Sequence, residues 1–96
     1  MNKAMGIIEI DVSSISSSEE LHDLLSSKLS FPDYYGRNWD AFWDCVRDPE
    51  QSIIPKQLFI RGWSKLESRL PRDAGLLREC LDELARERPE VTIEWR

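Results

Sequence analysis

Three short segments with the apolar pattern of β-strands constrain the fold most strongly. They lie at 4–12, at 58–60 and at 91–95, and the two stretches between them have helical spacing. Parallel strands require connections long enough to hold helices, whereas antiparallel neighbours can be joined by a tight turn. We therefore expect an α/β fold, in which a three-stranded parallel sheet packs with about four helices.

The first connection carries signals for two helices. Ser17 and Glu20 form a capping box before a helix that runs to about Leu29. A second helix is predicted over 39–47, after Asn38, which is a favoured N-cap residue. The apolar residues of this second helix share one face: Trp39, Phe42, Trp43 and Val46.

The second connection is predicted to hold a short helix over 63–70 and a longer one over 72–88. Pro71 and Pro89 separate and end these segments, because the residue before a proline avoids the helical conformation. The residues that the longer helix is expected to bury are Leu76, Leu77, Cys80, Leu81 and Leu84.

Length and composition indicate a soluble globular protein. With 96 residues, of which 41% are hydrophobic and 32% charged, residues 1–96 are expected to form a single domain with one modest core. No apolar run approaches the roughly 20 residues that a membrane span needs, and no signal peptide is recognisable. We therefore expect a cytoplasmic protein with no membrane partner.

The charge is acidic and unevenly distributed. The formal net charge is −5 at pH 7, and residues 1–50 contain ten acids and four bases. Direct binding of nucleic acid requires a basic surface, so we expect none, and a cationic partner fits better. Solubility alone is an equally good explanation of the charge at this point.

The metal-binding and redox-active residue types are scarce. Cys45, Cys80 and His22 have no zinc-site spacing, and two cysteines are too few for a disulfide framework. Both cysteines fall at apolar helical positions and are interpreted as small buried hydrophobes in a protein from a reducing compartment. His22 is interpreted as a surface residue. We expect no cofactor, no metal and no catalytic residue.

The most informative stretch is 32–45, where two aspartates lie one helical turn apart. Asp40 and Asp44 share a helix face, and like charges at this spacing repel each other weakly. Their oxygens would be good acceptors for guanidinium or ammonium groups. The aromatic residues beside them are of the types favoured at interfaces: Tyr34, Tyr35, Trp39 and Trp43. The alternative is that the aromatic residues are core and the aspartates a solvated face.

The same stretch resembles the barstar family of intracellular ribonuclease inhibitors. The matching residues are Tyr34-Tyr35-Gly36, Asn38, Asp40-Ala41 and Trp43-Asp44-Cys45. The resemblance implies a small domain with a three-stranded parallel sheet and four helices. It also implies an inhibitor, or immunity protein, that blocks the basic active-site cleft of a barnase-type guanyl-specific ribonuclease with its second helix and the adjoining loops.

The resemblance assigns roles to individual residues. Asp44 would take the place of a substrate phosphate among the enzyme's arginines and catalytic histidine, and Asp40 would contact the other side of the cleft. Tyr34 would stack near the catalytic histidine, and Glu83 and Glu87 would add acidic contacts from the last helix. The full set of expected partner-binding residues is Tyr34, Gly36, Asn38, Trp39, Asp40, Trp43, Asp44, Glu83 and Glu87.

Several residues depart from the family pattern. Arg37 adds a positive charge inside the motif, Trp39 is bulkier than the expected aliphatic residue, and the segment 46–54 reads as a longer loop. The expected partner is a basic, barnase-like ribonuclease or a toxin nuclease domain, and the free chain is expected to be a monomer. These departures keep an alternative open: an orphan barstar-like adaptor that binds a different basic protein.

The remaining class of function is an enzyme that uses the two aspartates for catalysis. A pair of carboxylates can perform acid–base hydrolysis, as in glycosidases. No nucleophile, metal site or phosphate-binding loop accompanies Asp40 and Asp44 in this sequence, so we expect the chain not to be an enzyme.

Overall fold

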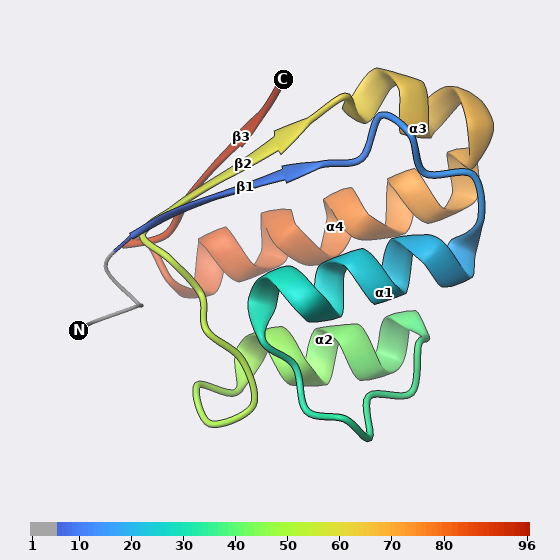
Figure 1. The fold of residues 1–96 in the computed structure, drawn as a ribbon. Helices are drawn as coiled ribbons and strands as arrows, with labels where there is room; N and C mark the ends of the chain where they lie inside the picture. The colour runs from blue at the N-terminus through green and yellow to red at the C-terminus, as the bar shows by residue number, and fades with distance from the viewer. Residues whose placement is uncertain (1–5) are drawn as a thin grey trace.

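The structure is a computed structural model that describes residues 6–96, and in this range it has three strands and four helices (Figure 1). All strand pairings are parallel, which confirms the expected α/β fold. The elements are, in chain order, β1 (Ile7–Asp11), α1 (Ser18–Leu29), α2 (Trp39–Arg47), β2 (Gln57–Arg61), α3 (Trp63–Arg69), α4 (Pro71–Glu87) and β3 (Thr92–Trp95).

The sheet has the spatial order β1-β2-β3, with the central strand contributed by the middle of the chain. Leu58 on β2 is in register with Ile8 on one side and Ile93 on the other. Figure 1 shows α1 and α4 against one face of the sheet, with α2 beyond them and farther from the strands. The helix that carries the aspartate pair is therefore an outer element of the fold.

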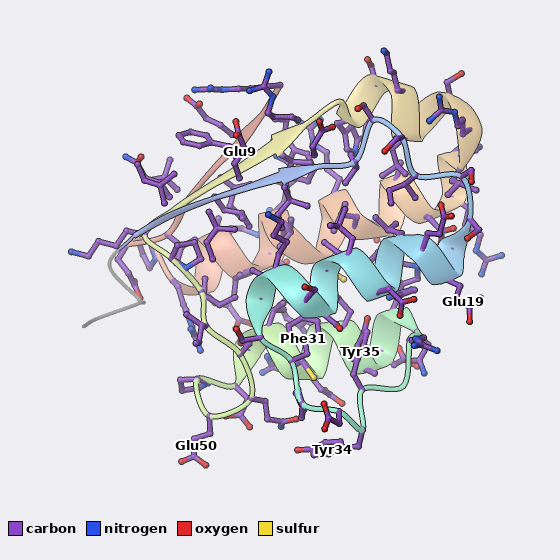
Figure 2. The ribbon with its side chains drawn as sticks, viewed as in Figure 1. Glu9, Glu19, Phe31, Tyr34, Tyr35 and Glu50 are labelled. Carbon is purple, nitrogen blue, oxygen red and sulfur yellow. The ribbon has the colours of Figure 1, made fainter. Side chains whose placement is uncertain are left out.

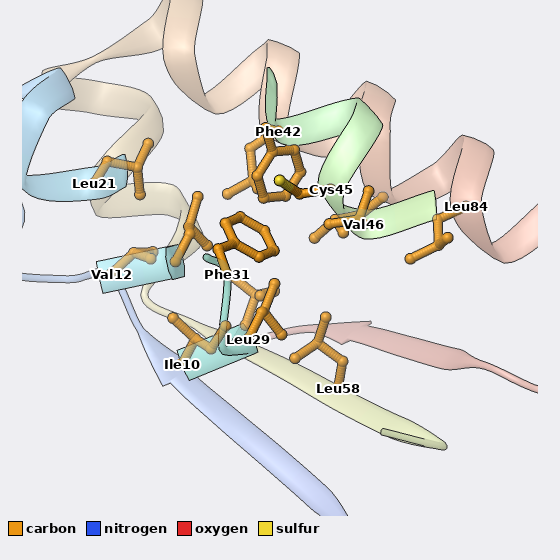
Figure 3. Close-up of a cluster of buried hydrophobic side chains, with 14 of the residues drawn as sticks. Ile10, Val12, Leu21, Leu29, Phe31, Phe42, Cys45, Val46, Leu58 and Leu84 are labelled. Atoms are coloured by element: carbon orange, nitrogen blue, oxygen red, sulfur yellow. The ribbon is translucent and has the colours of Figure 1, made fainter. Parts of the chain in front are cut away.

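The hydrophobic core lies between the sheet and the helices (Figure 3). Phe42 and Val46 are fully buried and tie α2 to this core. Removing such a side chain from water contributes roughly 1.5–3 kcal/mol. The other fully buried hydrophobic residues are Ile10, Val12, Leu21, Leu25, Leu29, Leu58, Ile60, Leu66, Ala74, Leu77, Leu81 and Leu84.

The predicted helix starts of the first connection are confirmed. The Ser17 hydroxyl accepts a hydrogen bond from the Glu20 N–H at 3.1 Å, and the Asn38 side chain accepts one from the Ala41 N–H at 2.8 Å. The capping box differs in one detail. The Glu20 carboxylate accepts from the N–H of Ser16, one residue earlier than the box predicts, and this bond lowers the pKa of Glu20.

The strands are found where the sequence placed them, with small shifts at their ends. The first strand begins at Ile7, and positions 4 and 5 of the predicted segment lie outside the described residues. The sequence predicts that the central strand opens at Pro55, with 58–60 as its apolar part and Arg61 near its end. It begins two residues later, at Gln57, and the last strand begins at Thr92 rather than at 91.

The long helix corrects two details of the prediction. Pro71 is its first residue, where the missing N–H of proline costs nothing. Leu76 and Cys80 are only partly buried, whereas Ala74 is fully buried. The reason is that the buried stripe runs through Ala74, Leu77, Leu81 and Leu84 and leaves Leu76 and Cys80 at its flanks.

None of the helices between residues 6 and 96 has the length and apolar character that crossing a membrane requires.

Candidate partner-binding surface

Asp40 and Asp44 lie on the exposed side of α2. The opposite side of the same helix holds Phe42 and Val46 in the core, which fixes the direction in which the aspartates project. Within residues 6–96 neither carboxylate forms an ion pair. Two acceptor groups on a rigid helix are thus available to an external cation.

Arg37, the basic residue inside the motif, is directed toward α1. Its guanidinium lies 2.7 Å from the Asp23 carboxylate and 3.6 Å from that of Glu19. Its backbone adopts a positive φ of 53°, which turns the chain just before the helix. The acids of α1 therefore balance the charge of Arg37. Within residues 6–96 Arg37 forms no ion pair with Asp40 or Asp44, so it does not neutralise them.

The two tyrosines of the loop before α2 have different environments. Tyr34 is 76% exposed, and its hydroxyl donates to the side-chain oxygen of Gln51 at 3.3 Å. Tyr35 is half-buried against Phe31, with 4.9 Å between ring centroids, and burial raises the pKa of its phenol. Figure 2 shows Tyr34 at the outer edge of the molecule and Tyr35 close to the helices. Tyr34 is accessible to a partner, and Tyr35 holds the loop in place.

His22 is buried, so the interpretation of this histidine as a surface residue is wrong. Its exposed fraction is 1%, and its Nδ1 atom lies 2.5 Å from the hydroxyl of Tyr35. Its ring also packs against that of Trp39, with a centroid distance of 4.5 Å. Because it precedes Leu25 by three residues and Leu29 by seven, helical spacing places it on the buried stripe of α1, and this signal predicts its burial.

Trp39 connects three helices rather than standing free for a partner. Its ring lies between His22 on α1 and Phe42 of its own helix, and its indole N–H donates to Asp73 on α4 at 2.9 Å. The side chain is half-buried. Its exposed part belongs to the candidate surface, but its main contacts are internal.

Gly36 and Asn38 shape the start of α2. Asn38 caps the helix, and its side-chain amide also donates to the carbonyl of Gly36 at 3.3 Å. A Cβ atom on Gly36 would lie 3.2 Å from that amide nitrogen, which is tighter than an ordinary contact. Both residues are exposed; the cap at Asn38 is expected from the sequence, whereas the close approach of Gly36 to the Asn38 amide is not.

The structure brings Trp43 of α2 next to Glu83 of α4, forty positions along the chain. Both line an open pocket of about 420 Å³ between the two helices. The remaining lining residues were not predicted as part of the site: Glu79, Cys80, Asp82 and Arg86. They are found only when the two helices are packed together, because all four lie on α4 and sequence reasoning cannot rotate that helix against α2.

The acidic residues expected from α4 are already paired within the chain. Glu83 forms an ion pair with Arg86, and Glu87 lies 3.7 Å from Arg47 of α2. The guanidinium of Arg47 also lies 5.0 Å from the centre of the Trp43 ring, within reach of a cation–π contact. The α4 side of the surface is thus electrostatically different from the open α2 side.

The cysteines are unpaired and have no sign of reactivity. Cys45 is buried, as expected, and Cys80 is half-buried. Burial, with smaller contributions from the charges of Glu79 and Asp40, raises the pKa of Cys80 to about 11, so its thiol stays protonated at neutral pH. In the part of the chain that the structure describes, no three His, Cys, Asp or Glu residues are placed to hold a metal.

Comparison with known proteins agrees with this geometry. A family model described as Barstar (barnase inhibitor) matches residues 5–95. A Bacillus subtilis protein named "Putative ribonuclease inhibitor YrdF" is 59% identical over 39 residues, which is 41% of this chain and 43% of that protein. The matched part thus spans less than half of that relative. Because the family model covers nearly the whole sequence, this chain belongs to the barstar family, whose members are inhibitors and not enzymes.

Proposed function

We propose that this protein inhibits a barnase-type, guanyl-specific ribonuclease by filling the enzyme's basic active-site cleft with α2 and the loop before it. The observation that carries this proposal is the pair Asp40 and Asp44, which project from one face of an outer helix without an ion pair in residues 6–96. Family membership supports the inhibitory role, and the chain's acidic charge supports a cationic partner.

Inhibition by occlusion follows from ordinary electrostatics. A cleft that binds RNA phosphates is lined by cationic groups, and carboxylates form strong charge-assisted hydrogen bonds with them. In this proposal Asp44 occupies a phosphate position and Asp40 contacts the other wall of the cleft. Because Phe42 and Val46 hold α2 in the core, little conformational entropy is lost on docking.

The residues around the aspartates complete the proposed contact. Tyr34 is exposed beside α2 and offers a rigid aromatic surface. Gly36, Asn38 and the accessible parts of Trp39 and Trp43 would form the rest of the α2 side. No chemical step is required of the inhibitor, and no contact with nucleic acid is needed.

The proposed biological role is protection of the cell that makes the ribonuclease, as an immunity protein or antitoxin in the cytoplasm. The two unpaired cysteines suit a reducing compartment. The acidic half of the chain would also accelerate association with a basic enzyme through long-range attraction, which salt screens.

The direct test is an RNA-cleavage assay with barnase and other basic guanyl-specific ribonucleases. We expect inhibition that is competitive with RNA, because the inhibitor and the substrate would occupy the same cleft. Absence of inhibition across the panel would contradict the proposal. Capture of a basic protein that is not a ribonuclease, lost on Asp44→Ala, would instead favour the adaptor alternative.

A further inference from the structure

Arg86 is an exposed cation on the α4 side of the surface. It forms an ion pair with Glu83 and lines the same pocket as Trp43. We infer that Arg86 is a specificity-determining residue, which masks Glu83 against ribonucleases that present a cation at this position. The inference rests on the proposed function, because it assumes that α2 and α4 face the same enzyme.

The pocket geometry explains why the mask is effective. Three carboxylates line the pocket, those of Glu79, Asp82 and Glu83, and Trp43 forms its aromatic wall on α2. Such a combination would suit an incoming guanidinium, which pairs with carboxylates and stacks on indole rings. Arg86 is the cation that lines this pocket in the chain itself. An arginine of the partner would therefore have to displace it, or be repelled by it.

A second intramolecular pair supports the same interpretation. Arg47 contacts Glu87 at 3.7 Å and its guanidinium lies 5.0 Å from the Trp43 ring centre. Both candidate acids of α4 are thus compensated by arginines, whereas both aspartates of α2 are open. The surface accordingly divides into an α2 half, whose aspartates are open to an external cation, and an α4 half, whose two candidate contact acids are already paired with arginines.

The ion pair between Arg86 and Glu83 contributes little to the stability of the free protein, but it affects the affinity of a complex. The side chains of Arg86 and Glu83 are 69% and 46% exposed, and exposed ion pairs contribute little to stability. When a partner excludes water from the pocket, a displaced Arg86 or an uncompensated Glu83 becomes costly. The pair therefore discriminates between ribonucleases only when a complex forms, and it has little effect on the stability of the free protein.

Arg86→Gln tests the inference, with Arg72→Gln as the matched control. Arg72 is exposed at the other end of α4, and the structure pairs it with no acid in residues 6–96, so the control changes the net charge equally. With barnase as the probe, we expect Arg86→Gln to raise affinity about three- to tenfold above wild type, and Arg72→Gln to have a smaller effect. A gain no larger than that of Arg72→Gln, or no binding by either variant, would overturn the inference.

Two further substitutions separate this inference from the proposed function. Glu83→Gln should weaken barnase binding more in the Arg86→Gln background than in wild type, because only there is the carboxylate unmasked. Additive effects would contradict masking. Asp44→Ala reports on the proposed function itself: if it weakens binding while Arg86→Gln behaves like Arg72→Gln, only the masking fails. If Arg86→Gln strengthens binding and Asp44→Ala changes nothing, the α2 recognition fails instead.

Discussion

Neighbouring residues of the motif divide between holding the fold and facing outward. Tyr35 contacts the buried His22, while Tyr34 next to it is exposed. Asp44 is exposed on α2, while Cys45 beside it is buried. The division follows from helix and loop geometry, because adjacent side chains point in different directions. We therefore expect substitutions of neighbours to report on different properties, on the proposed binding for the exposed residue and on stability for the buried one.

Asp44→Ala should weaken ribonuclease binding by about 2–5 kcal/mol, because truncating one partner of a desolvated charge pair leaves the other unpaired. Glu87→Ala should have a much smaller effect, because Arg47 already compensates Glu87 in the free protein. Glu67→Ala, an exposed acid on α3, controls for net charge. Calorimetric titration measures all three, and equal losses for Asp44→Ala and Glu87→Ala would mean that α2 does not enter the cleft.

The buried His22 predicts a loss of stability in mild acid. Burial lowers the pKa of His22 below its ordinary value of 6.5, opposed by the charges of Asp73 and Asp23 and assisted by that of Arg37. The unfolded state therefore binds the proton more tightly. Stability from this residue is fully present above pH 6.5 and is lost as the pH falls below it.

Urea unfolding between pH 7.5 and pH 5 checks this pH dependence. The wild type should lose stability over this range, and His22→Gln, which cannot titrate there, should lose less. Parallel pH profiles for the two proteins would show that other groups are responsible.

At the scale of elements, two glycines predict opposite effects of the same substitution. Gly62, between β2 and α3, has φ +76°, and a Cβ there would lie 2.5 Å from the Cβ of Ser13. Gly62→Ala should therefore lower the free energy of unfolding by more than about 2 kcal/mol. Gly75 lies inside α4 with nothing within 4 Å of an added Cβ, so Gly75→Ala should raise it by about 0.5–1 kcal/mol. Urea denaturation of the pair measures both, and a tolerated Gly62→Ala would contradict the close approach to Ser13.

The order of strands and helices is predictable from the sequence because its signals are local. The caps at Ser17 and Asn38 and the apolar spacing of each segment act over a few residues. The pair of Glu83 and Arg86, three residues apart on one helix, is readable from spacing in the same way.

Contacts between helices cannot be predicted from local sequence signals. The pocket that joins Trp43 to Glu83, the contact of Arg47 with Glu87, and the burial of Ala74 in place of Cys80 all depend on how α4 is rotated against α2 and the sheet. That rotation is set by the packing of the whole core. The motif therefore predicts the α2 side of the surface and the resemblance names Glu83 and Glu87, but the way in which α4 meets α2 is found only in the structure.

In the whole molecule, the outermost layer is formed by a helix from the acidic half of the chain. The sheet lies on one side and α2 on the other, with α1 and α4 between them (Figure 1). The acidic half of the chain, residues 1–50, includes α2, so the charge excess is carried partly by the outermost helix. This arrangement leaves the two exposed aspartates on the outermost helix, where the proposed basic partner would reach them.

The most direct test of the central claim is a titration of barnase-catalysed RNA cleavage with the wild type and with a variant that carries both Asp40→Asn and Asp44→Asn. These exchanges remove the charges and keep the side-chain shapes on the exposed face of α2. The wild type should abolish cleavage at an equimolar ratio, and the double variant should leave most of the activity at that ratio. Equal inhibition by the two proteins would contradict the claim that the paired carboxylates of α2 occupy the enzyme's cleft.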